Sequence, residues 1–488
     1  MAIAKKRLTS RPLKDRNVYA DAGDLGLRFI FPTPDLDRGG IARDPREGHF
    51  GTIVGQGGSG KSILALQIVT ELLNQADSVN TNNEDGRVHA AFYFSLEAHP
   101  TELRRQVQQF TWGYKRYKAW GNNIGVPGLS GEHEYSNGLY LVSVPPPAES
   151  LNALLLKIRQ TIAGEFKRVK NPVAIVIDPI GAVETEDDFG TNLTQLTELA
   201  NMHRTFLFLL VEQYAFNKYT SIEHYSQSII HLEHDPGQQQ HRRLYVQKAR
   251  GQAFRSGYHS FELQSSNGIR VFPSVDAQSA HAHERLSALQ SSDPQLSNPE
   301  TVAFFPEGND STFLGDEQIE AGSAVFLMGP PGTFKEYVAS EFAVAEQDGA
   351  TIYVSFKADF DAIRKAMEKR AHKKAELIDS RGEREQLLTP TTYFYDARSP
   401  LLTPEEILFT VNNFIATTPA AGPSGLTKSV PFRRAIIWGL RRLYDFPNFK
   451  DNIVRFLEAL VTTLKSQRIT TLVVDWPDKT SKMSRRLC

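Results

Sequence analysis

The residues from Gly55 to Ser62 have the types and the spacing that bind phosphate. Their sequence, GQGGSGKS, satisfies the pattern G-x-x-x-x-G-K-[ST] of a phosphate-binding loop. Glycines let a backbone wrap closely around phosphates, and the N–H groups of such a loop point inward toward the anion. The residues expected to form this cradle are Gly55, Gly57, Gly58, Ser59, Gly60, Lys61 and Ser62.

The flanking sequence favours a strand before the loop and a helix after it, as the motif requires. Residues 49–54 are typical of a strand, and residues 63–69 are typical of a helix whose positive N-terminal end faces the phosphates. We expect Lys61 to reach the outer phosphates and Ser62 to place its hydroxyl on Mg²⁺. An ordinary glycine-rich turn is the alternative, but such a turn does not require lysine and serine at these positions.

Two acidic residues follow runs that are typical of strands. Asp178 ends the apolar run 173–177, and a carboxylate at the carboxyl end of a parallel strand faces the ligand crevice. It is a candidate for holding Mg²⁺, with a turn or helix N-cap aspartate as the alternative. Glu97 follows the strand expected at 89–94 and is the candidate for activating water, with a surface or capping carboxylate as the alternative. Together with the cradle, these residues indicate ATP hydrolysis.

The chain contains a second, altered copy of the loop. Residues 329–336 read GPPGTFKE, in which Phe334 replaces the last glycine and Glu336 replaces the Mg²⁺ hydroxyl. A bulky side chain crowds the place where backbone must approach phosphate, and a carboxylate adds negative charge to an anionic site. We therefore expect this copy not to bind nucleotide.

The repeat continues downstream of the loop, which indicates two copies of one unit. The paired segments are 93–98 with 353–358, 101–105 with 361–365, and 174–178 with 435–439. In this alignment Lys357 stands in the place of Glu97, and Gly439 stands in the place of Asp178. We expect one nucleotide per chain, bound by the first copy.

The composition is that of an ordinary soluble globular protein. The 488 residues are enough for two or three domains, with 40% hydrophobic and 23% charged residues. The single cysteine, Cys488, excludes an internal disulfide framework and suits a reducing cytoplasm. Residues 1–16 are basic without the apolar core of a secretory signal, and no run reaches the roughly 18 apolar residues of a membrane span. The formal net charge of −1 gives no overall attraction to nucleic acid.

The first half of the chain resembles the RecA-like ATPases, and most closely their KaiC-like branch. The resemblance covers nearly all of residues 17–273, through the segments 35–40, 55–62, 94–100, 173–178, 222–230, 248–251, 260–263 and 267–273. In such proteins ATP lies between neighbouring subunits, so the resemblance implies that Lys248 and Arg250 reach phosphates bound by the next subunit. Gln252 and Phe254 depart from the threonine and histidine that the family usually has just beyond this motif.

We therefore expect an α/β protein with two RecA-like P-loop domains, each built on a doubly wound and mostly parallel sheet. The expected parts are a basic N-terminal tail at 1–16, an active ATPase domain at 17–273, a linker at 274–298 and a degenerate pseudo-ATPase domain at 299–488. About sixty residues with a hairpin follow strand 205–211 in the first domain. Only a short polar tail follows the equivalent strand at 470–474, so we expect the second domain to be C-terminally truncated.

The resemblance implies a cytoplasmic homo-oligomer, with a hexameric ring favoured over a filament and with ATP and Mg²⁺ as ligands. We expect the nucleotide state to control the binding of an unidentified protein partner, with the second domain as a scaffold. The clock protein of this branch phosphorylates itself in its second domain, and we do not expect this activity where the second-copy motifs are lost. Nucleic-acid handling by a recombinase-like or repair-accessory ATPase, a bacterial defence role and a switch that barely hydrolyses ATP are the alternatives.

Overall fold

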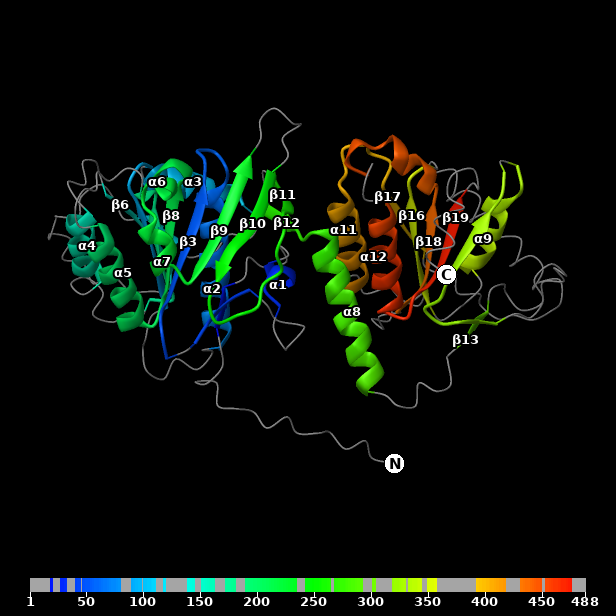
Figure 1. Ribbon diagram of the computed structural model, residues 1–488, viewed down its shortest axis with the longest axis horizontal. Helices are drawn as coiled ribbons and strands as arrows, with labels where there is room; N and C mark the ends of the chain where they lie inside the picture. Colours follow the sequence, from blue (N-terminus) through cyan, green and yellow to red (C-terminus); the bar gives the residue numbers. More distant parts are fainter. Residues whose placement is uncertain are drawn as a thin grey trace. The chain divides into compact units, whose positions relative to one another are not determined.

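Two sheets organise the chain, a mostly parallel one and a smaller parallel one, one in each of two units, Met1–Pro273 and Ser274–Cys488. Figure 1 shows the computed structural model. The structure describes residues 18–20, 27–32, 40–44, 46–79, 89–98, 100–110, 117–119, 138–144, 151–162, 172–180, 189–234, 242–264, 267–292, 301–303, 318–330, 332–344, 349–357, 392–417, 431–449 and 453–475.

The first unit alternates strands and helices along most of its length. Its strands are β1 (Val18–Ala20), β2 (Ile41–Arg43), β3 (His49–Gly55), β4 (Ala90–Ser95), β5 (Tyr117–Ala119), β6 (Gly138–Ser143), β7 (Ala174–Asp178), β8 (Phe206–Glu212), β9 (Ser228–His234), β10 (Arg242–Ala249), β11 (His259–Gln264) and β12 (Gly268–Phe272). Its helices are α1 (Leu27–Ile30), α2 (Lys61–Val79), α3 (Pro100–Gln109), α4 (Leu151–Gln160), α5 (Phe189–His203), α6 (Gln213–Lys218) and α7 (Ser221–Tyr225).

One large sheet holds ten of these strands, counted over the described residues, in the order β12-β11-β10-β9-β3-β8-β7-β4-β6-β5. The run from β9 to β5 is parallel, and β10, β11 and β12 extend it as an antiparallel meander. The short pair β1–β2 forms a separate sheet. Since parallel strands all end at the same edge, the carboxyl ends of β3, β4, β7 and β8 meet there.

Helices cover both faces of this sheet, which makes it doubly wound (Figure 1). Side chains of α2, together with Leu103 of α3, bury one face. Side chains of α4 and α5 bury the other face. The central strands β3 and β4 are buried along their whole length because both faces are covered. The expected α/β fold with a mostly parallel sheet is confirmed.

Strand positions in the first unit follow the hydrophobic pattern of the sequence closely. The seven strands expected at 49–54, 89–94, 139–143, 173–177, 205–211, 228–232 and 243–246 correspond to β3, β4, β6, β7, β8, β9 and β10. Five described strands of the first unit were not expected. Strands β1, β2 and β5 have only three residues each, too few for a period of two to stand out. Strands β11 and β12, of six and five residues, were not expected either.

The second unit contains a smaller, wholly parallel sheet. Its elements are α8 (Val275–Ser292), β13 (Thr301–Ala303), β14 (Gln318–Glu320), β15 (Ala324–Met328), α9 (Lys335–Val344), β16 (Ala350–Ser355), β17 (Thr392–Asp396), α11 (Pro404–Thr417), β18 (Phe432–Trp438), the 3₁₀ turns η5 (Leu440–Asp445) and η6 (Pro447–Phe449), α12 (Ile453–Lys465) and β19 (Thr470–Asp475). The sheet order is β15-β19-β18-β16-β17, which matches β3-β8-β7-β4-β6 of the first unit strand for strand.

Helix α8 corrects the expectation of a linker over residues 274–298. Residues 275–292 form this helix, which packs against α11 and α12 of its own unit. Val275, Gln278 and Ala282 are buried at spacings of three and four, and the Gln278 side chain donates to the Glu405 carbonyl at 3.0 Å. The sequence suggested a linker because the buried face of this helix consists mostly of small and polar residues, not of large apolar ones. Its alanines nevertheless favour a helix, because alanine has the highest helix propensity.

The two units also share the geometry of one helix end. Arg204 follows α5 with φ 48°, and Arg468 lies shortly after α12 with φ 56°. In each case the next residue donates its N–H to a carbonyl five positions back, Thr205 to Ala200 and Ile469 to Leu464, both at 3.0 Å. This left-handed cap turns the chain from the helix into β8 or β19.

Candidate active site

The glycine-rich loop lies between the end of β3 and the start of α2, as its sequence predicts. Gly58 and Gly60 have φ of +73° and +103°, which side chains rarely adopt. A Cβ on Gly55 would lie 2.5 Å from the Ser59 hydroxyl, whereas a Cβ on Gly57 would meet nothing within 4 Å. The Ser59 hydroxyl is buried and has no hydrogen-bond partner within the described structure.

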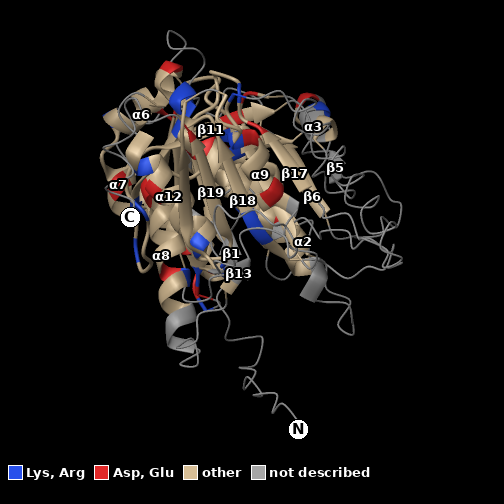
Figure 2. Cartoon of the chain, turned by 90° about the vertical axis from the view of Figure 1, so that its right-hand side faces the viewer, with Lys and Arg blue, Asp and Glu red and all other residues tan. Residues whose placement is uncertain are grey.

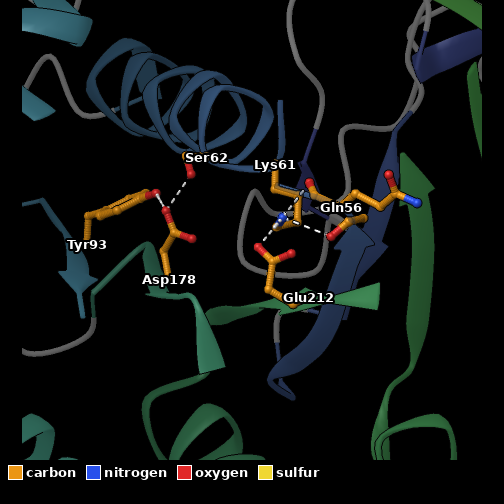
Figure 3. A network of polar contacts seen from close by, with 7 residues as sticks. Gln56, Lys61, Ser62, Tyr93, Asp178 and Glu212 are labelled. Carbon is orange, nitrogen blue, oxygen red and sulfur yellow. Dashed lines mark hydrogen bonds and ion pairs between the residues drawn. The ribbon is translucent and has the colours of Figure 1, made fainter. Parts of the chain in front are cut away.

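The Lys61 ammonium is held within the loop and by one acidic side chain. It donates to the carbonyl oxygens of Gly55 at 2.9 Å and Gln56 at 3.0 Å, and to Glu212 Oε1 at 2.7 Å (Figure 3). Glu212 is the last residue of β8, which pairs with β3 so that Glu212 lies opposite Gly55. The pairing of β8 with β3 therefore places Glu212 where it holds the Lys61 ammonium beneath the loop.

Ser62 and Asp178 are brought together, as expected of residues that share a metal ion. The Ser62 hydroxyl donates to Asp178 Oδ2 at 2.5 Å, and the Tyr93 hydroxyl donates to the same oxygen (Figure 3). Burial raises the pKa of the Asp178 carboxyl above its ordinary value, while these two hydrogen bonds lower it. The pair lies below the N-terminus of α2, beside the Lys61 cluster.

Glu97 lies just beyond β4, two residues after Ser95, which pairs with Asp178. The side chain is exposed, and the neighbouring Leu96 N–H donates to the Asp178 carbonyl at 2.7 Å. Partial burial raises the pKa of the Glu97 carboxyl above its usual value, and the charges of Asp178 and Glu212 raise it further. The pairing of β4 with β7 therefore places Glu97 at the carboxyl ends of the parallel strands, where the cradle also lies.

Lys248 and Arg250 lie far from the loop of their own chain, toward the amino-terminal ends of the parallel strands. Gly55 pairs with Leu232, and Leu232 pairs with Leu244, so this part of β10 lies level with the loop. From Leu244, β10 runs away from the loop, and a rise of about 3.3 Å per residue puts Arg250 roughly 20 Å away. The Lys248 ammonium donates to the Glu223 carbonyl, and Arg250 is exposed.

Three contacts at the site were not anticipated from the sequence. They involve Tyr93, Glu212 and Arg242, whose guanidinium donates to the Gly58 carbonyl at 2.9 Å. A signal did exist for Tyr93, because a hydroxyl in a strand that is buried along its whole length must find a partner. Glu212 and Arg242 carry no comparable signal, because their contacts depend on which strands are neighbours.

The loop of the second unit keeps the shape of a cradle. Lys335 donates to the carbonyls of Gly329 and Pro330, as Lys61 does to Gly55 and Gln56. Gly332 has φ +83°, close to that of Gly58. Phe334 occupies the place of Gly60 with φ 58°, and 76% of its surface is exposed. A bulky aromatic side chain therefore stands where the first unit has only backbone.

Strand register changes one part of the expected alignment between the copies. Ser95 pairs with Asp178, whereas Ser355 pairs with Trp438, so Trp438 rather than Gly439 is equivalent to Asp178. Matching of the sequences alone was wrong by one residue because both segments are apolar and carry little positional information. The conclusion that the second copy lacks this carboxylate is unchanged.

An aromatic pair replaces the Tyr93–Asp178 hydrogen bond in the second unit. Tyr353 and Trp438 stack with ring centroids 6.4 Å apart. Glu336, at the position of Ser62, raises the pKa of Tyr353 through its charge, although burial is the larger cause. A Cβ on Gly439 would meet the Lys357 side chain at 2.6 Å, so this corner is closely packed.

The donor set of the first unit fits Mg²⁺ together with a polyphosphate. Ser62 and Asp178 supply hard oxygen ligands, which Mg²⁺ prefers. The described residues contain no group of three or more His, Cys, Asp or Glu side chains that could hold a metal alone. Phosphate oxygens and water must therefore complete the coordination of an ion at this place.

Comparisons with known proteins agree with this site. Residues 34–276 match the family model described as "ATPase: KaiC". A UPF0273 protein of Methanopyrus kandleri is 25% identical over 230 residues, which cover 45% of this chain and 82% of that protein. The match and the loop together define the first unit as a RecA-type P-loop ATPase domain. Within that class it is KaiC-like. None of the described helices has the length and apolar character to cross a membrane.

Proposed function

We propose that the first unit binds Mg-ATP in the Gly55–Ser62 cradle and hydrolyses it. The observation that carries the proposal is the convergence of Lys61, Ser62, Asp178 and Glu97 at one sheet edge. Lys61 supplies positive charge to the outer phosphates, and the N–H groups of the loop bind their oxygens. This arrangement provides both the positioning and the electrostatic stabilisation that phosphoryl transfer requires.

In the proposed reaction, Glu97 acts as the base. It accepts a proton from water as the water oxygen bonds to the γ-phosphorus and the bond to the bridging oxygen of ADP breaks. Ser62 and Asp178 would hold Mg²⁺, which when bound would neutralise charge on the phosphate oxygens. Tyr93 fixes the Asp178 carboxylate through its hydroxyl.

Lys248 and Arg250 act on ATP bound by a neighbouring subunit in this proposal. Their place, about 20 Å from the loop of their own chain, argues against a role on their own nucleotide. A head-to-tail contact would bring them to the next cradle, where they stabilise charge in the transition state. We favour a hexameric ring over a filament, since a closed head-to-tail assembly leaves no free ends.

The second unit serves as a pseudo-ATPase scaffold in this proposal. Its strand order and loop shape favour descent from the same fold, while Phe334, Glu336, Lys357 and Trp438 stand at four functional positions. The assembly then acts in the cytoplasm as a regulator whose nucleotide state controls the binding of a protein partner.

A role in nucleic-acid handling is the alternative. Figure 2 shows basic and acidic residues interspersed over the described elements that face the viewer, and the formal net charge is −1. Protein surfaces that bind nucleic acid are strongly basic, so this pattern favours a protein partner. Stimulation of hydrolysis by single-stranded DNA would favour the alternative instead.

Glu97→Gln and Lys61→Ala test the proposal together. Glu97→Gln should bind one ATP per chain and lose hydrolysis by about 10²-fold or more, because an amide cannot accept the proton. Lys61→Ala should bind no nucleotide in either unit, because the first cradle loses its cation and the second is degenerate. Equilibrium dialysis with Mg-ATP and phosphate release measure both properties.

Hydrolysis at the wild-type rate by Glu97→Gln would remove Glu97 as the base. Saturable, Mg²⁺-dependent binding by Lys61→Ala would show a second nucleotide site and contradict the scaffold role. Glu198→Gln, an exposed carboxylate on α5, is the control for loss of one negative charge in the same unit.

A further inference from the structure

The Lys61 ammonium has its hydrogen-bonding capacity filled by its own chain. An ammonium group has three donors, and the partners here are the carbonyls of Gly55 and Gln56 and the carboxylate of Glu212. A phosphate that reaches Lys61 must take the place of one partner. Two of the partners are backbone atoms fixed by the loop, whereas Glu212 is a side chain that can rotate.

Glu212 also resembles the incoming phosphate in charge. Its carboxylate lies 2.7 Å from the ammonium, and its side chain keeps 22% of its surface exposed, against 6% for Lys61. The carboxylate is therefore more accessible to solvent than the ammonium that it holds. Two anions cannot share one compact cation without strong mutual repulsion.

Within the described part of the chain, the Glu212 side chain makes no hydrogen bond or ion pair other than that with Lys61. Glu212 is the N-cap residue of α6, yet its side chain makes no capping hydrogen bond to that helix. Its charge is felt across the site, because it contributes to the raised pKa of both Glu97 and Asp178. An acidic side chain that faces two other carboxylates is unfavourable unless Lys61 compensates for it.

We propose that Glu212 is a displaceable counter-ion that holds Lys61 in the nucleotide-free protein and competes with the nucleotide phosphates for it. The inference rests on the proposed function, since it requires that the cradle binds nucleotide. Glu212 thereby weakens the binding of phosphate-bearing ligands and keeps Lys61 in place between turnovers. The competition acts on the outer phosphates, which are the ones that the lysine reaches.

Glu212→Gln tests this role through binding alone. The amide keeps the size of the side chain and removes its charge, so Mg-ATP should bind at least about tenfold more tightly, as expected for loss of a charged hydrogen bond that opposes binding. AMP lacks the outer phosphates, so its affinity should stay unchanged. Glu198→Gln should leave both affinities unchanged. Calorimetric titration of the full-length variants measures each dissociation constant.

The gain for ATP without a gain for AMP separates this role from general loosening of the site. Unchanged or weaker ATP binding by Glu212→Gln, with normal binding by the wild type, would overturn the inference and leave the proposed function intact. Absence of ATP binding by the wild type would overturn both. If Glu212→Gln does not fold, Glu212→Asp replaces it: the shortened carboxylate should also tighten ATP binding, and an unchanged affinity would overturn the inference.

Discussion

Asp178 Oδ2 accepts two hydrogen bonds, and this single atom connects three elements of the site. Ser62 reaches it from α2, and Tyr93 reaches it from β4. The two donors stabilise the charged form of a carboxylate whose pKa is raised by burial. Tyr93 is therefore a positioning residue for the proposed metal ligand.

Tyr93→Phe should lower kcat by roughly tenfold or more with little change in the KM for ATP, because one hydrogen bond to a charged group is lost. Without that bond the pKa of Asp178 rises further, so the acidic limb of the pH–rate profile should move to higher pH. Steady-state kinetics across the acidic range measure both effects. Tyr140→Phe, a buried tyrosine of β6, is the control. An unmoved acidic limb in Tyr93→Phe would show that the hydroxyl does not tune Asp178.

At the scale of residues, the sequence predicts what fixed spacing determines. Lys61, Ser62 and Asp178 lie together because a loop motif and the end of an apolar strand are both visible in a linear chain. Tyr93 and Glu212 join them only because β8 and β7 lie between β3 and β4 in the sheet. The order of the strands is a property of the folded sheet, and it cannot be predicted from apolar strand sequences of similar composition.

At the scale of elements, long strands were predictable and a polar helix was not. The strands around the site bury both faces, so their apolar runs are continuous and their positions can be read from the sequence. Helix α8 buries alanine and glutamine, and its composition resembles that of a linker. The one-residue error at Trp438 has a related cause, since only the hydrogen-bonded register distinguishes neighbouring apolar positions.

The first residue of β3 should make the stability of that strand depend on pH. His49 is fully buried, its Nε2 lies 2.8 Å from the Ser228 hydroxyl, and burial, followed by the charge of Arg43, lowers its pKa from 6.5 to about 3. Below pH 6.5 the His49 imidazole is therefore protonated in the unfolded chain but stays neutral in the folded chain until the pH approaches 3. Stability contributed by neutral His49 is complete above pH 6.5 and falls as the pH drops toward 3.

A decrease from pH 7 to pH 5 should lower the free energy of unfolding by about 2 kcal/mol through His49. Hydrogen exchange of the β3 amides, corrected for intrinsic rates, measures the opening free energy at the two pH values. His49→Gln should show a shallower decline than the wild type, although it is less stable at pH 7. His224→Gln, on the exposed surface of α7, should follow the wild type. Parallel declines in all three proteins would exclude this role for His49.

At the scale of the whole molecule, the two sheets share one strand order but differ in what lies beyond it. The first sheet continues from β3 through β9 to the meander β10–β12, whereas β15 is the edge strand of the second sheet among the described residues. The meander carries Lys248, and Arg250 follows it directly. Among the described residues, the first unit thus combines a cradle with the two residues that are proposed to act on a neighbour.

The separation of these two groups of residues within the first unit implies that a complete active site requires assembly of subunits. A cradle with Glu97 lies at the carboxyl ends of the parallel strands, and Lys248 with Arg250 lies toward their amino-terminal ends. An isolated subunit would hold both halves of a site without being able to join them. The specific activity should therefore rise steeply with protein concentration.

Mixing Arg250→Ala with Glu97→Gln tests this arrangement most directly. Each variant alone should be nearly inactive, since a trans-acting arginine contributes roughly 10³–10⁵ to the rate. In a co-assembled equal mixture, about one quarter of the interfaces combine an intact Glu97 with an intact Arg250, so about one quarter of the wild-type activity should return. Lys61→Ala mixed with Glu97→Gln should stay inactive, because both changes affect the subunit that binds the nucleotide, and no interface then has both residues intact on that side. No recovery in an Arg250→Ala and Glu97→Gln mixture shown to co-assemble would contradict catalysis between subunits.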